Sequence, residues 1–569
     1  RRCKIWFFPP VDVGGPSKFP VFRGYPSRTH RGNGNPPVEC MFTFNNAFLL
    51  FVRTRRRRTH SRAVRITRRR QHLSLSLSLS FQMCACVFPS VCFEEFLHFI
   101  HFSTLEKNEY KEWSSSFWGD VLNSTPHFST FAGPEREREG RRMSKFLASL
   151  VKPLVDALLQ PNVSTLHSIN EIQKAASVRC HKYVYDYIAG GSDDESALRN
   201  NAESFRNKFD AYPFVLNGVG PENVCTKTRI LGTVDVDVPF IPAPIAGNAM
   251  FHTDGERAVA RVAKRFGTTY ALSTLATTSC EEIKACLDEN DGDGDKTHKM
   301  FQMYVWNEGE LVDEALRKAK ESGFETLVLT VDLTWFGNRE RDKRNGFSIP
   351  PKLSDPKFIY ECLKKPCWTV DAVRGWKSRT FEYAALRDDT KLMEKQRDDM
   401  AGFVRDVFNP TFDWEDAKAL REKWGKKFIL KGVHRADDAV KAFEYLKADA
   451  VWISNHGGRQ LDGAVAPFDA LPGIRKAVGE DKELIIDGGI RRGSDIALAL
   501  ALGANAVAIG KPVAFGLAAG GEKGVKRTFT ILKEELERTM GLVGARTIAE
   551  LRSKGNEIFV KRERLRNSS

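Results

Sequence analysis

The sequence predicts an α/β protein built around a (β/α)8 barrel, or TIM barrel, of eight parallel strands. Three observations support this fold class. Eight short apolar runs rich in Val, Ile and Leu follow Pro239, nearly every run is followed by a helical pattern, and no GxGxxG motif follows the first run. Strands buried on both faces and alternating with helices indicate a parallel sheet, and eight such units fit a closed barrel better than an open dinucleotide-binding sheet.

The apolar runs give the predicted strands in chain order. They lie at residues 240–246, 270–273, 301–305, 326–331, 428–433, 450–454, 484–486 and 506–509. Amphipathic patterns between them predict helices over residues 254–266, 308–322, 437–447 and 494–502. A capping box of Thr253 and Glu256 is expected to open the first of these helices.

Further helices are expected ahead of the barrel. Ser168 with Glu171, and Ser192 with Glu195, form two more candidate capping boxes, with a Gly-Gly stop at 190–191 between them. Two or three helices therefore precede the first strand.

One connection, from residue 339 to residue 413, is far longer than the others. Loops of that length are usually lids or binding segments, and this one leaves the barrel face that carries chemistry. Pro350, Pro351, Pro356 and Pro366 argue against one continuous helix, although residues 391–407 have a helical pattern.

Composition suggests four regions along the 569 residues. Residues 1–142 hold 23 Lys or Arg and 11 Asp or Glu, which leaves 64 and 61 for the rest, so the net charge of +15 belongs mainly to this leader. The leader has no sustained periodicity and is interpreted as a disordered tail, or as translated non-coding sequence ahead of a start at Met143; a targeting leader or a basic nucleic-acid arm is the alternative. An N-terminal helical segment over 143–215, the barrel over 216–555 and a C-terminal tail over 556–569 follow.

The remaining bulk features concern compartment and membrane. The eleven Cys show no CxxC pair and no regular spacing, so a reducing compartment is expected and no metal site is predicted. No apolar run is long enough to span a bilayer. The compartment is left open between cytoplasm and mitochondrion; a peroxisomal address is not supported, because the sequence ends in Asn567-Ser-Ser rather than Ser-Lys-Leu.

Polar residues close most of the apolar runs, where a barrel assembles its active site. These residues are Ser273, Gln302 and Tyr304, Thr330 and Asp332, Lys431, Ser454 and His456, Asp487 with Gly488 and Gly489, and Gly510 with Lys511. An unpaired ammonium inside a strand is costly, so Lys431 is expected to face an anionic or electron-rich partner.

Two further patterns point to chemistry. Asp487-Gly-Gly-Ile-Arg491 and Ile509-Gly-Lys511 form paired glycine loops after the last two strands, which favour a bound phosphate. After the sixth strand, His456 is suited to act as a base and Arg459 to clamp a carboxylate, with Asp332 orienting the imidazole.

These residues resemble the FMN-dependent 2-hydroxy-acid oxidases and dehydrogenases, a family that includes glycolate oxidase, lactate oxidase, L-lactate dehydrogenase and the flavin domain of flavocytochrome b2. The resemblance runs from about residue 169 to 551. Its most specific motif is SNHGGRQLDG at 454–463, supported by VYDYIAGG at 184–191, FQMYV at 301–305, LTVD at 329–332, LKGV at 430–433 and DGGIRRG at 487–493.

The resemblance implies roles for individual residues. FMN would be held by Ala246, Ser273, Gln302, Thr330, Lys431, Ser454, Asp487, Gly489, Arg491, Gly510 and Lys511. Tyr187, Tyr304, Arg339, His456 and Arg459 would bind the substrate, and His456, Asp332 and Tyr304 would be the catalytic residues. The implied reaction is oxidation of a small (S)-2-hydroxy acid, L-lactate or glycolate, to the 2-oxo acid.

Two positions depart from the family pattern. Lys511 stands where the family usually has Arg, so the single charge of an ammonium group replaces the two parallel hydrogen-bond donors of a guanidinium group. Leu275 stands where glycolate oxidases carry Trp, which favours lactate over glycolate. Oxygen is the first expectation for the electron acceptor and a quinone or soluble carrier the second, and family analogy implies a homotetramer.

Other readings remain open at this point. A barrel like that of inosine-monophosphate dehydrogenase shares the glycine loops but needs a nucleophilic Cys after the sixth strand, and no Cys follows Cys367. A non-catalytic flavin- or nucleotide-binding barrel is the other alternative, although intact His456, Arg459, Tyr304 and Asp332 argue against it. The near-neutral charge after residue 142 argues against nucleic acid as the ligand of the barrel.

Overall fold

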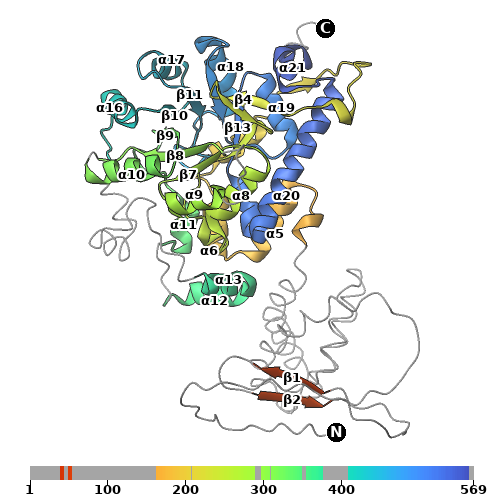
Figure 1. Cartoon of the computed structure of the whole chain (residues 1–569), viewed down its shortest axis with the longest axis vertical. Helices are drawn as coiled ribbons and strands as arrows, with labels where there is room; N and C mark the ends of the chain where they lie inside the picture. The colour runs from red at the N-terminus through yellow and green to blue at the C-terminus, as the bar shows by residue number, and fades with distance from the viewer. Residues whose placement is uncertain are drawn as a thin grey trace, which may run out of the picture. The chain divides into compact units, whose positions relative to one another are not determined.

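The computed structural model describes residues 39–43, 49–53, 162–206, 208–288, 297–307, 309–348, 354–375 and 408–562. The chain divides into two compact units, Arg1–His127 and Phe128–Ser569. In the first unit, β1 (Glu39–Thr43) pairs antiparallel with β2 (Leu49–Arg53) (Figure 1). The rest of the predicted 1–142 leader lies outside the described residues.

The second unit is a (β/α)8 barrel, as the sequence predicts. Its strands are β6 (Phe240–Pro242), β7 (Tyr270–Ser273), β8 (Lys299–Tyr304), β9 (Thr326–Thr330), β10 (Lys427–Val433), β11 (Ala450–Ile453), β12 (Glu483–Ile486) and β13 (Ala506–Ile509). They pair in parallel in the order β7-β8-β9-β10-β11-β12-β13-β6, and β6 contacts β7 to complete the ring. All eight predicted strands are present, and their bounds differ from the predicted ones by at most four residues.

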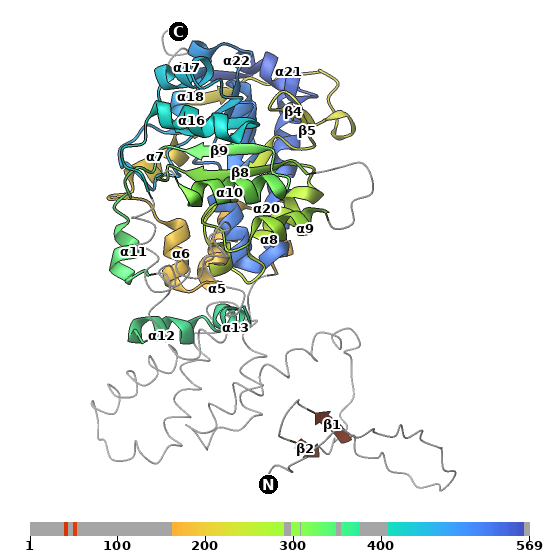
Figure 2. The ribbon, with the colours of Figure 1, turned by 60° about the vertical axis from the view of Figure 1, so that its left-hand side comes forward.

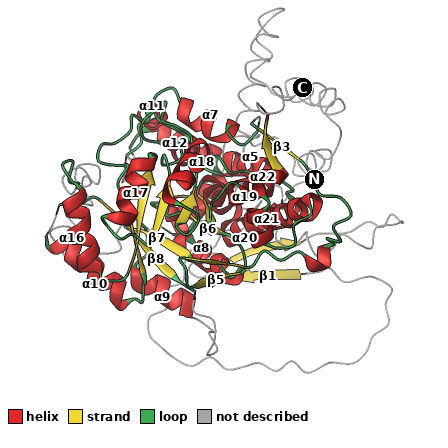
Figure 3. Cartoon of the chain, turned by 90° about the horizontal axis from the view of Figure 1, so that it is seen from above, coloured by secondary structure: helices red, strands yellow, loops and turns green. Residues whose placement is uncertain are grey.

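Helices surround the strands, as the view from above shows (Figure 3). They are α8 (Gly255–Arg265), α9 (Cys280–Asp288), α10 (Glu310–Glu321), α16 (Trp414–Trp424), α17 (Ala436–Glu444), α18 (Pro467–Val478), α19 (Gly493–Ala501) and α20 (Lys511–Val543), the last interrupted by non-helical backbone at Gly520 and Gly521. Each of the four predicted barrel helices is found, with bounds that differ from the predicted ones by at most three residues. No helix of the described residues is both long and apolar enough to cross a membrane.

Shorter elements flank the barrel at both ends of the chain. They are η2 (Val163–Thr165), α5 (Ile169–Arg179), α6 (Lys182–Ala189), α7 (Ser196–Glu203), β3 (Phe209–Ala211), η3 (Pro221–Asn223), β4 (Thr228–Ile230), β5 (Val234–Val236), η4 (Asn248–Met250), α21 (Ile548–Ser553), α22 (Gly555–Ile558) and β14 (Phe559–Lys561). In Figure 2, α7 and α11 (Glu340–Asn345) lie on one side of β8 and β9, and β4 and β5 lie on the opposite side. The β14 strand pairs antiparallel with β3, so the last described strand is hydrogen-bonded to the segment between α7 and the first barrel strand.

One of the three predicted capping boxes is borne out in part, and two are wrong. Ser168 caps α5 by accepting a hydrogen bond from the Glu171 amide, while the Glu171 carboxylate accepts from the amide of His167. At α7 the helix begins at Ser196, and the Glu195 carboxylate accepts from Gly191 instead of pairing with Ser192.

The predicted box at α8 fails because tertiary contacts claim both of its side chains. Thr253 donates to Asp371 from the long connection, and Glu256 accepts from the amides of Asn248 and Thr277. The helix begins at Gly255 after Asp254, which makes no side-chain cap. A capping box that is predicted from sequence spacing does not form when its side chains have stronger hydrogen-bond partners in another segment of the chain.

The long connection holds three short helices, α11 (Glu340–Asn345), α12 (Pro356–Lys364) and α13 (Pro366–Arg374). Pro356 and Pro366 each stand at the first position of a helix, where the missing N–H would have no partner within the helix. These prolines therefore divide the segment into short helices, as the sequence predicts. The helical pattern predicted over 391–407 lies outside the described residues.

Inside the barrel, alternate strand residues point to the axis. Ile241, Ala271, Met300, Val328, Ile429, Trp452, Ile485 and Ala508 belong to one buried cluster inside the ring, which also contacts Ile230 and Val236 from the β4–β5 hairpin. Side chains alternate faces along a strand, so the residue two positions later on each strand also points inward, one layer nearer the carboxyl end. The first polar side chains of the barrel interior lie in that layer.

Candidate functional site

The inward layer above the apolar barrel core is polar. Two positions after Ala271, Met300 and Val328 come Ser273, Gln302 and Thr330, all buried. Ser273 Oγ donates to Gln302 Oε1 at 3.0 Å, and Gln302 Nε2 donates to Thr330 Oγ1 at 3.1 Å. A chain of hydrogen bonds thus joins the ends of β7, β8 and β9.

A second polar chain crosses β10, β11 and β12 at the same height. Lys431 is 4% exposed and its Nζ donates to Ser454 Oγ at 3.1 Å, while Ser454 Oγ also donates to Asp487 Oδ1 at 2.8 Å. Lys431 Nζ lies 3.8 Å from Asp487 Oδ2, so the buried ammonium has a carboxylate beside it. The expectation that Lys431 has an anionic partner is met inside the protein by Asp487, and both side chains also line the pocket above.

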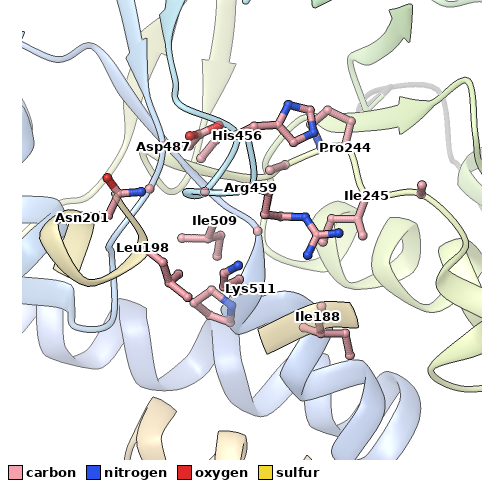
Figure 4. A pocket seen from close by; sticks show the side chains of 18 of the residues that line it. Ile188, Leu198, Asn201, Pro244, Ile245, His456, Arg459, Asp487, Ile509 and Lys511 are labelled. Atoms are coloured by element: carbon pink, nitrogen blue, oxygen red, sulfur yellow. The ribbon is translucent and has the colours of Figure 1, made fainter. Parts of the chain in front are cut away.

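That pocket opens at the carboxyl ends of the strands (Figure 4). Twelve of the expected site residues line it, namely Tyr187, Ala246, Tyr304, Arg339, Lys431, His456, Arg459, Asp487, Gly489, Arg491, Gly510 and Lys511. The five that do not line it are Ser273, Gln302, Thr330, Asp332 and Ser454, each of which bonds to another residue at the strand ends. The structure thus brings together every residue that the sequence singled out.

His456 sits on a loop with unusual backbone geometry. Its φ is +57°, and Gly457 and Gly458 follow at +66° and +73°. A Cβ on Gly458 would lie 2.5 Å from the amide nitrogen of Leu198, so α7 packs against the loop at that point. A non-glycine residue at positive φ costs roughly 1 to 3 kcal/mol and persists only where its surroundings fix it. The packing of α7 and the bond from the His456 amide to Ser454 Oγ supply that constraint.

The His456 imidazole is paired with Asp332. Nδ1 lies 3.1 Å from Asp332 Oδ1, and the Asp332 side chain is 6% exposed. Because Nδ1 is engaged by a carboxylate, Nε2 is the ring nitrogen left to face the pocket. Gly432 makes the approach of Asp332 possible, since a Cβ there would lie 2.7 Å from that of Asp332.

Burial and charge act against each other on this pair. Burial lowers the pKa of His456, and Asp332 raises it, with burial the stronger effect. Burial also works to raise the pKa of Asp332, but the neighbouring His456 and Lys431 outweigh it and the net pKa is lowered. At neutral pH the pair is therefore a carboxylate and a neutral imidazole, which is the state of a base with an oriented partner.

Four cations meet in the pocket, and none of them has a carboxylate of the described residues at ion-pair distance. Arg339, Arg459, Arg491 and Lys511 form no ion pair with a carboxylate among the described residues. Burial, then the charge of Arg459, lowers the pKa of Arg339 to about 10, and burial lowers that of Arg491 to about 10. Burial and the three arginines hold the pKa of Lys511 well below its ordinary value. Uncompensated buried cations are costly, so anionic ligands are expected here.

Two of these cations are held by backbone carbonyls at the end of α6. Arg459 Nη1 donates to the carbonyl of Tyr187, and Lys511 Nζ donates to that of Gly190 at 2.9 Å. The Arg459 guanidinium also lies 4.6 Å from the centroid of the Tyr187 ring. The carboxyl end of a helix carries partial negative charge, which stabilises nearby cations when no anionic ligand is bound.

The glycines after β12 shape one wall of the pocket. Gly489 has φ +85°, and a Cβ there would lie 1.8 Å from the carbonyl oxygen of Asn201 on α7. Asn201 in turn exchanges two side-chain hydrogen bonds of 2.7 Å with Asn455. Asn201 lines the pocket and no sequence pattern identified it, because it lies in a helix outside the barrel.

Aromatic residues that the sequence analysis did not single out support the substrate side of the pocket. Phe347 stacks on Tyr187 with ring centroids 4.9 Å apart, and Phe408 packs on Tyr304 at 5.3 Å. Burial raises the pKa of Tyr304, so its hydroxyl stays protonated at neutral pH. Both Phe residues lie within the long connection, near its two ends, and its fold could not be predicted from periodicity.

The donor set fits the FMN that the resemblance implies. Arg491 and Lys511 stand beside the glycine turns at β12 and β13, where a phosphate would be neutralised. The two polar chains, one ending at Thr330 and the other running from Lys431 to Asp487, supply hydrogen-bond donors and acceptors for the edge of a heterocyclic ring. No group of three or more His, Cys, Asp or Glu in the described part of the chain is arranged to hold a metal ion.

Comparisons with known proteins agree with this fit. The family model described as FMN-dependent dehydrogenase matches residues 176–557. Human 2-hydroxyacid oxidase 1 is 33% identical over 380 residues, which cover 67% of this chain and 93% of the relative. An L-lactate oxidase of a Nostoc species is 35% identical over 389 residues, covering 68% of this chain and 97% of the relative.

A solved structure supports the same assignment. The crystal structure of a monotopic membrane protein, (S)-mandelate dehydrogenase, has a TM-score of 0.62 and 33% identity, and the match covers 69% of this chain and 99% of that one. These matches exclude the inosine-monophosphate-dehydrogenase alternative. The chain belongs to the FMN-dependent dehydrogenase family and is an FMN-dependent 2-hydroxy-acid oxidoreductase.

Proposed function

We propose that the protein oxidises a small (S)-2-hydroxy acid to the corresponding 2-oxo acid, with His456 as the base. The observation that carries this proposal is the His456–Asp332 pair of 3.1 Å beside a pocket lined by Arg339 and Arg459. A base next to two unpaired guanidinium groups suits a substrate with a carboxylate adjacent to the carbon that loses a proton.

The substrate carboxylate is assigned to the two arginines. Arg339 and Arg459 are both free of carboxylate partners among the described residues, and each offers a planar fork of donors. Tyr304 and Tyr187, whose rings lie in the same pocket, supply hydroxyl donors for the carboxylate and the hydroxyl group of the substrate. Binding at several points places the substrate hydroxyl and α-carbon near His456 Nε2.

Proton removal is then assigned to the imidazole. His456 takes a proton from the substrate, and Asp332 stabilises the imidazolium that forms. FMN, when bound, would accept the two electrons and the second hydrogen that the substrate loses. Lys431 would stand beside the cofactor as a fixed positive charge, and its bond to Ser454 holds it in place.

The residues proposed to hold FMN are the two polar chains and the glycine turns. Ser273, Gln302, Thr330, Lys431, Ser454 and Asp487 would contact the ring system, and Ala246, Gly489, Arg491, Gly510 and Lys511 would complete the cradle and hold the phosphate. Lys511 offers a single charge where a fork is usual, so we expect phosphate binding that is weaker than in relatives with Arg.

L-lactate is the first substrate to test and glycolate the second, because Leu275 leaves more space than a Trp would. The protein, purified with FMN, is mixed with each acid in the absence of oxygen and its visible absorption is followed. Bleaching of the flavin by either acid supports the proposal, and rapid recolouring on admission of air identifies oxygen as the acceptor. Slow recolouring favours a quinone or a soluble carrier.

The control is His456→Gln, which keeps a polar side chain but no base. The variant is expected to stay yellow and to remain unbleached by the acid that bleaches the parent. A yellow parent protein that neither acid reduces would contradict the proposed substrates, and equal reduction of parent and variant would contradict the role of His456.

A further inference from the structure

We propose that the substrate pocket continues onto an apolar rim formed by Trp335, Phe336 and Leu461, and that the preferred substrates are 2-hydroxy acids with an apolar side chain of four or more carbons. The inference rests on the proposed function, because it assumes that the carboxylate lies at the two arginines. It narrows the substrate class of the same site.

The pocket has more than one apolar wall. Leu275, Leu333 and Phe336 form one of them, together with Ile245, while the charged lining residues lie at Lys431 on β10, on the loops after β11, β12 and β13, and at Arg339. Leu333 is 3% exposed and so forms a fixed part of this wall. With the carboxylate held at Arg339 and Arg459, this wall, whose Leu333 and Phe336 come a few residues ahead of Arg339, is the apolar surface we assign to the substrate's side chain.

Phe336 extends from this apolar wall of the pocket to the protein surface. It lines the pocket and is 49% exposed, so one face of the ring meets the cavity and another meets solvent. Its neighbour Trp335 is 79% exposed and Leu461 is 75% exposed. Large exposed apolar side chains beside a pocket mark a binding surface more often than isolated ones do.

The rim is held in place by buried contacts. Gln460 Nε2 donates to the carbonyls of Asp332 and Trp335 at 3.0 and 2.7 Å, which ties the loop after β9 to the loop that carries Arg459. Phe336 packs on buried Phe408 with ring centroids 5.3 Å apart. A Cβ on Gly337 would lie 2.2 Å from the carbonyl oxygen of Arg459, so the two loops are in direct contact.

An ordered apolar rim favours a long side chain over a methyl group. A methyl group at the α-carbon would reach only the inner wall, whereas each further methylene can cover part of Phe336 and then of the rim. Fully burying one methylene favours binding by about 0.8 kcal/mol, or about fourfold, and partial burial gives about twofold. The chain length at which this gain stops measures the length of the rim.

The experiment is a chain-length series on the FMN-loaded enzyme. Values of kcat/KM are measured for L-lactate, (S)-2-hydroxybutyrate, (S)-2-hydroxyhexanoate and (S)-2-hydroxyoctanoate. We expect kcat/KM to rise about two- to fourfold per methylene up to hexanoate. A flat or falling series would overturn the inference while leaving the proposed function intact, whereas failure of every acid, lactate included, would overturn the proposed function.

Two variants test the rim itself, each read as the ratio of kcat/KM for 2-hydroxyoctanoate to that for lactate. Phe336→Ala and Trp335→Ser are expected to lower this ratio by about fivefold or more. Phe214→Ala is the matched control, because Phe214 is also a partly exposed aromatic residue but lies against Gly544, away from the pocket. An unchanged ratio in both rim variants would overturn the inference.

Discussion

Replacing Asp332 by Asn tests the proposed base most directly. Asn keeps an oxygen that can accept a hydrogen bond from His456 Nδ1 but removes the negative charge 3.1 Å away. At an effective dielectric constant of about 20, that charge stabilises an imidazolium by about 5 kcal/mol. Because the hydrogen bond survives, we expect a loss of about 3 to 5 kcal/mol, or a reduction rate lower by about 10²- to 10⁴-fold.

The variant should also change the pH dependence. His456 acts as a base only when neutral, so the acid limb of kcat/KM follows its pKa. In the parent protein burial lowers this pKa and Asp332 raises it in part. Removal of the Asp332 charge takes away the raising contribution, so the pKa of His456 falls further. The acid limb is therefore expected to move to lower pH while the plateau drops.

The assay is anaerobic reduction of the bound flavin by L-lactate in a stopped-flow instrument across the acidic and neutral range. Asp371→Asn is the control, because Asp371 also lies near a histidine, 3.9 Å from His252 Nε2, but outside the pocket. It should keep the parent rate and pH profile. A loss below about tenfold in Asp332→Asn, with FMN bound and the acid limb unmoved, would refute the assigned role.

Three further predictions concern the pocket. Lys511→Met removes a buried cation, and FMN dissociation followed by fluorescence should weaken by about 10- to 100-fold, with loss of less than about twofold showing that Lys511 does not meet the phosphate. Gly489→Ala places a Cβ 1.8 Å from Asn201, so thermal unfolding should show destabilisation of about 2 kcal/mol or more, whereas Gly473→Ala, with no atom within 4 Å, should be neutral or stabilising. Arg459→Lys replaces a fork by a point charge and should raise KM for lactate by about tenfold; an unchanged KM in steady-state assays would place the carboxylate elsewhere.

The fold was predictable because its signals are local and repeated. Each strand is a short apolar run and most are followed by an amphipathic helix, so errors in one unit did not affect the others. The strand-end residues were predictable for the same reason. Alternation along each strand puts Gln302, Lys431 and Asp487 two positions after inward-facing apolar residues, and parallel strands bring those positions to one end of the barrel.

Contacts between distant segments were not predictable. The candidate capping box at Thr253 failed because Glu256 bonds to the amides of Asn248 and Thr277. At Ser192 the Glu195 carboxylate accepts instead from the nearby Gly191 amide and from the distant Arg341. Asn201 and Phe408 likewise gain their places from α7 and from the end of the long connection.

The sequence by itself thus determined the barrel and predicted the proposed base, its carboxylate partner and the cations of the pocket, because these depend on residue type and on position along a strand. Only the tertiary structure decided which groups stay without a counter-ion, how α6 holds Arg459 and Lys511, and where Phe336 reaches the surface. Those properties depend on distances between segments far apart in the chain, and burial then sets the charge and pKa of each group.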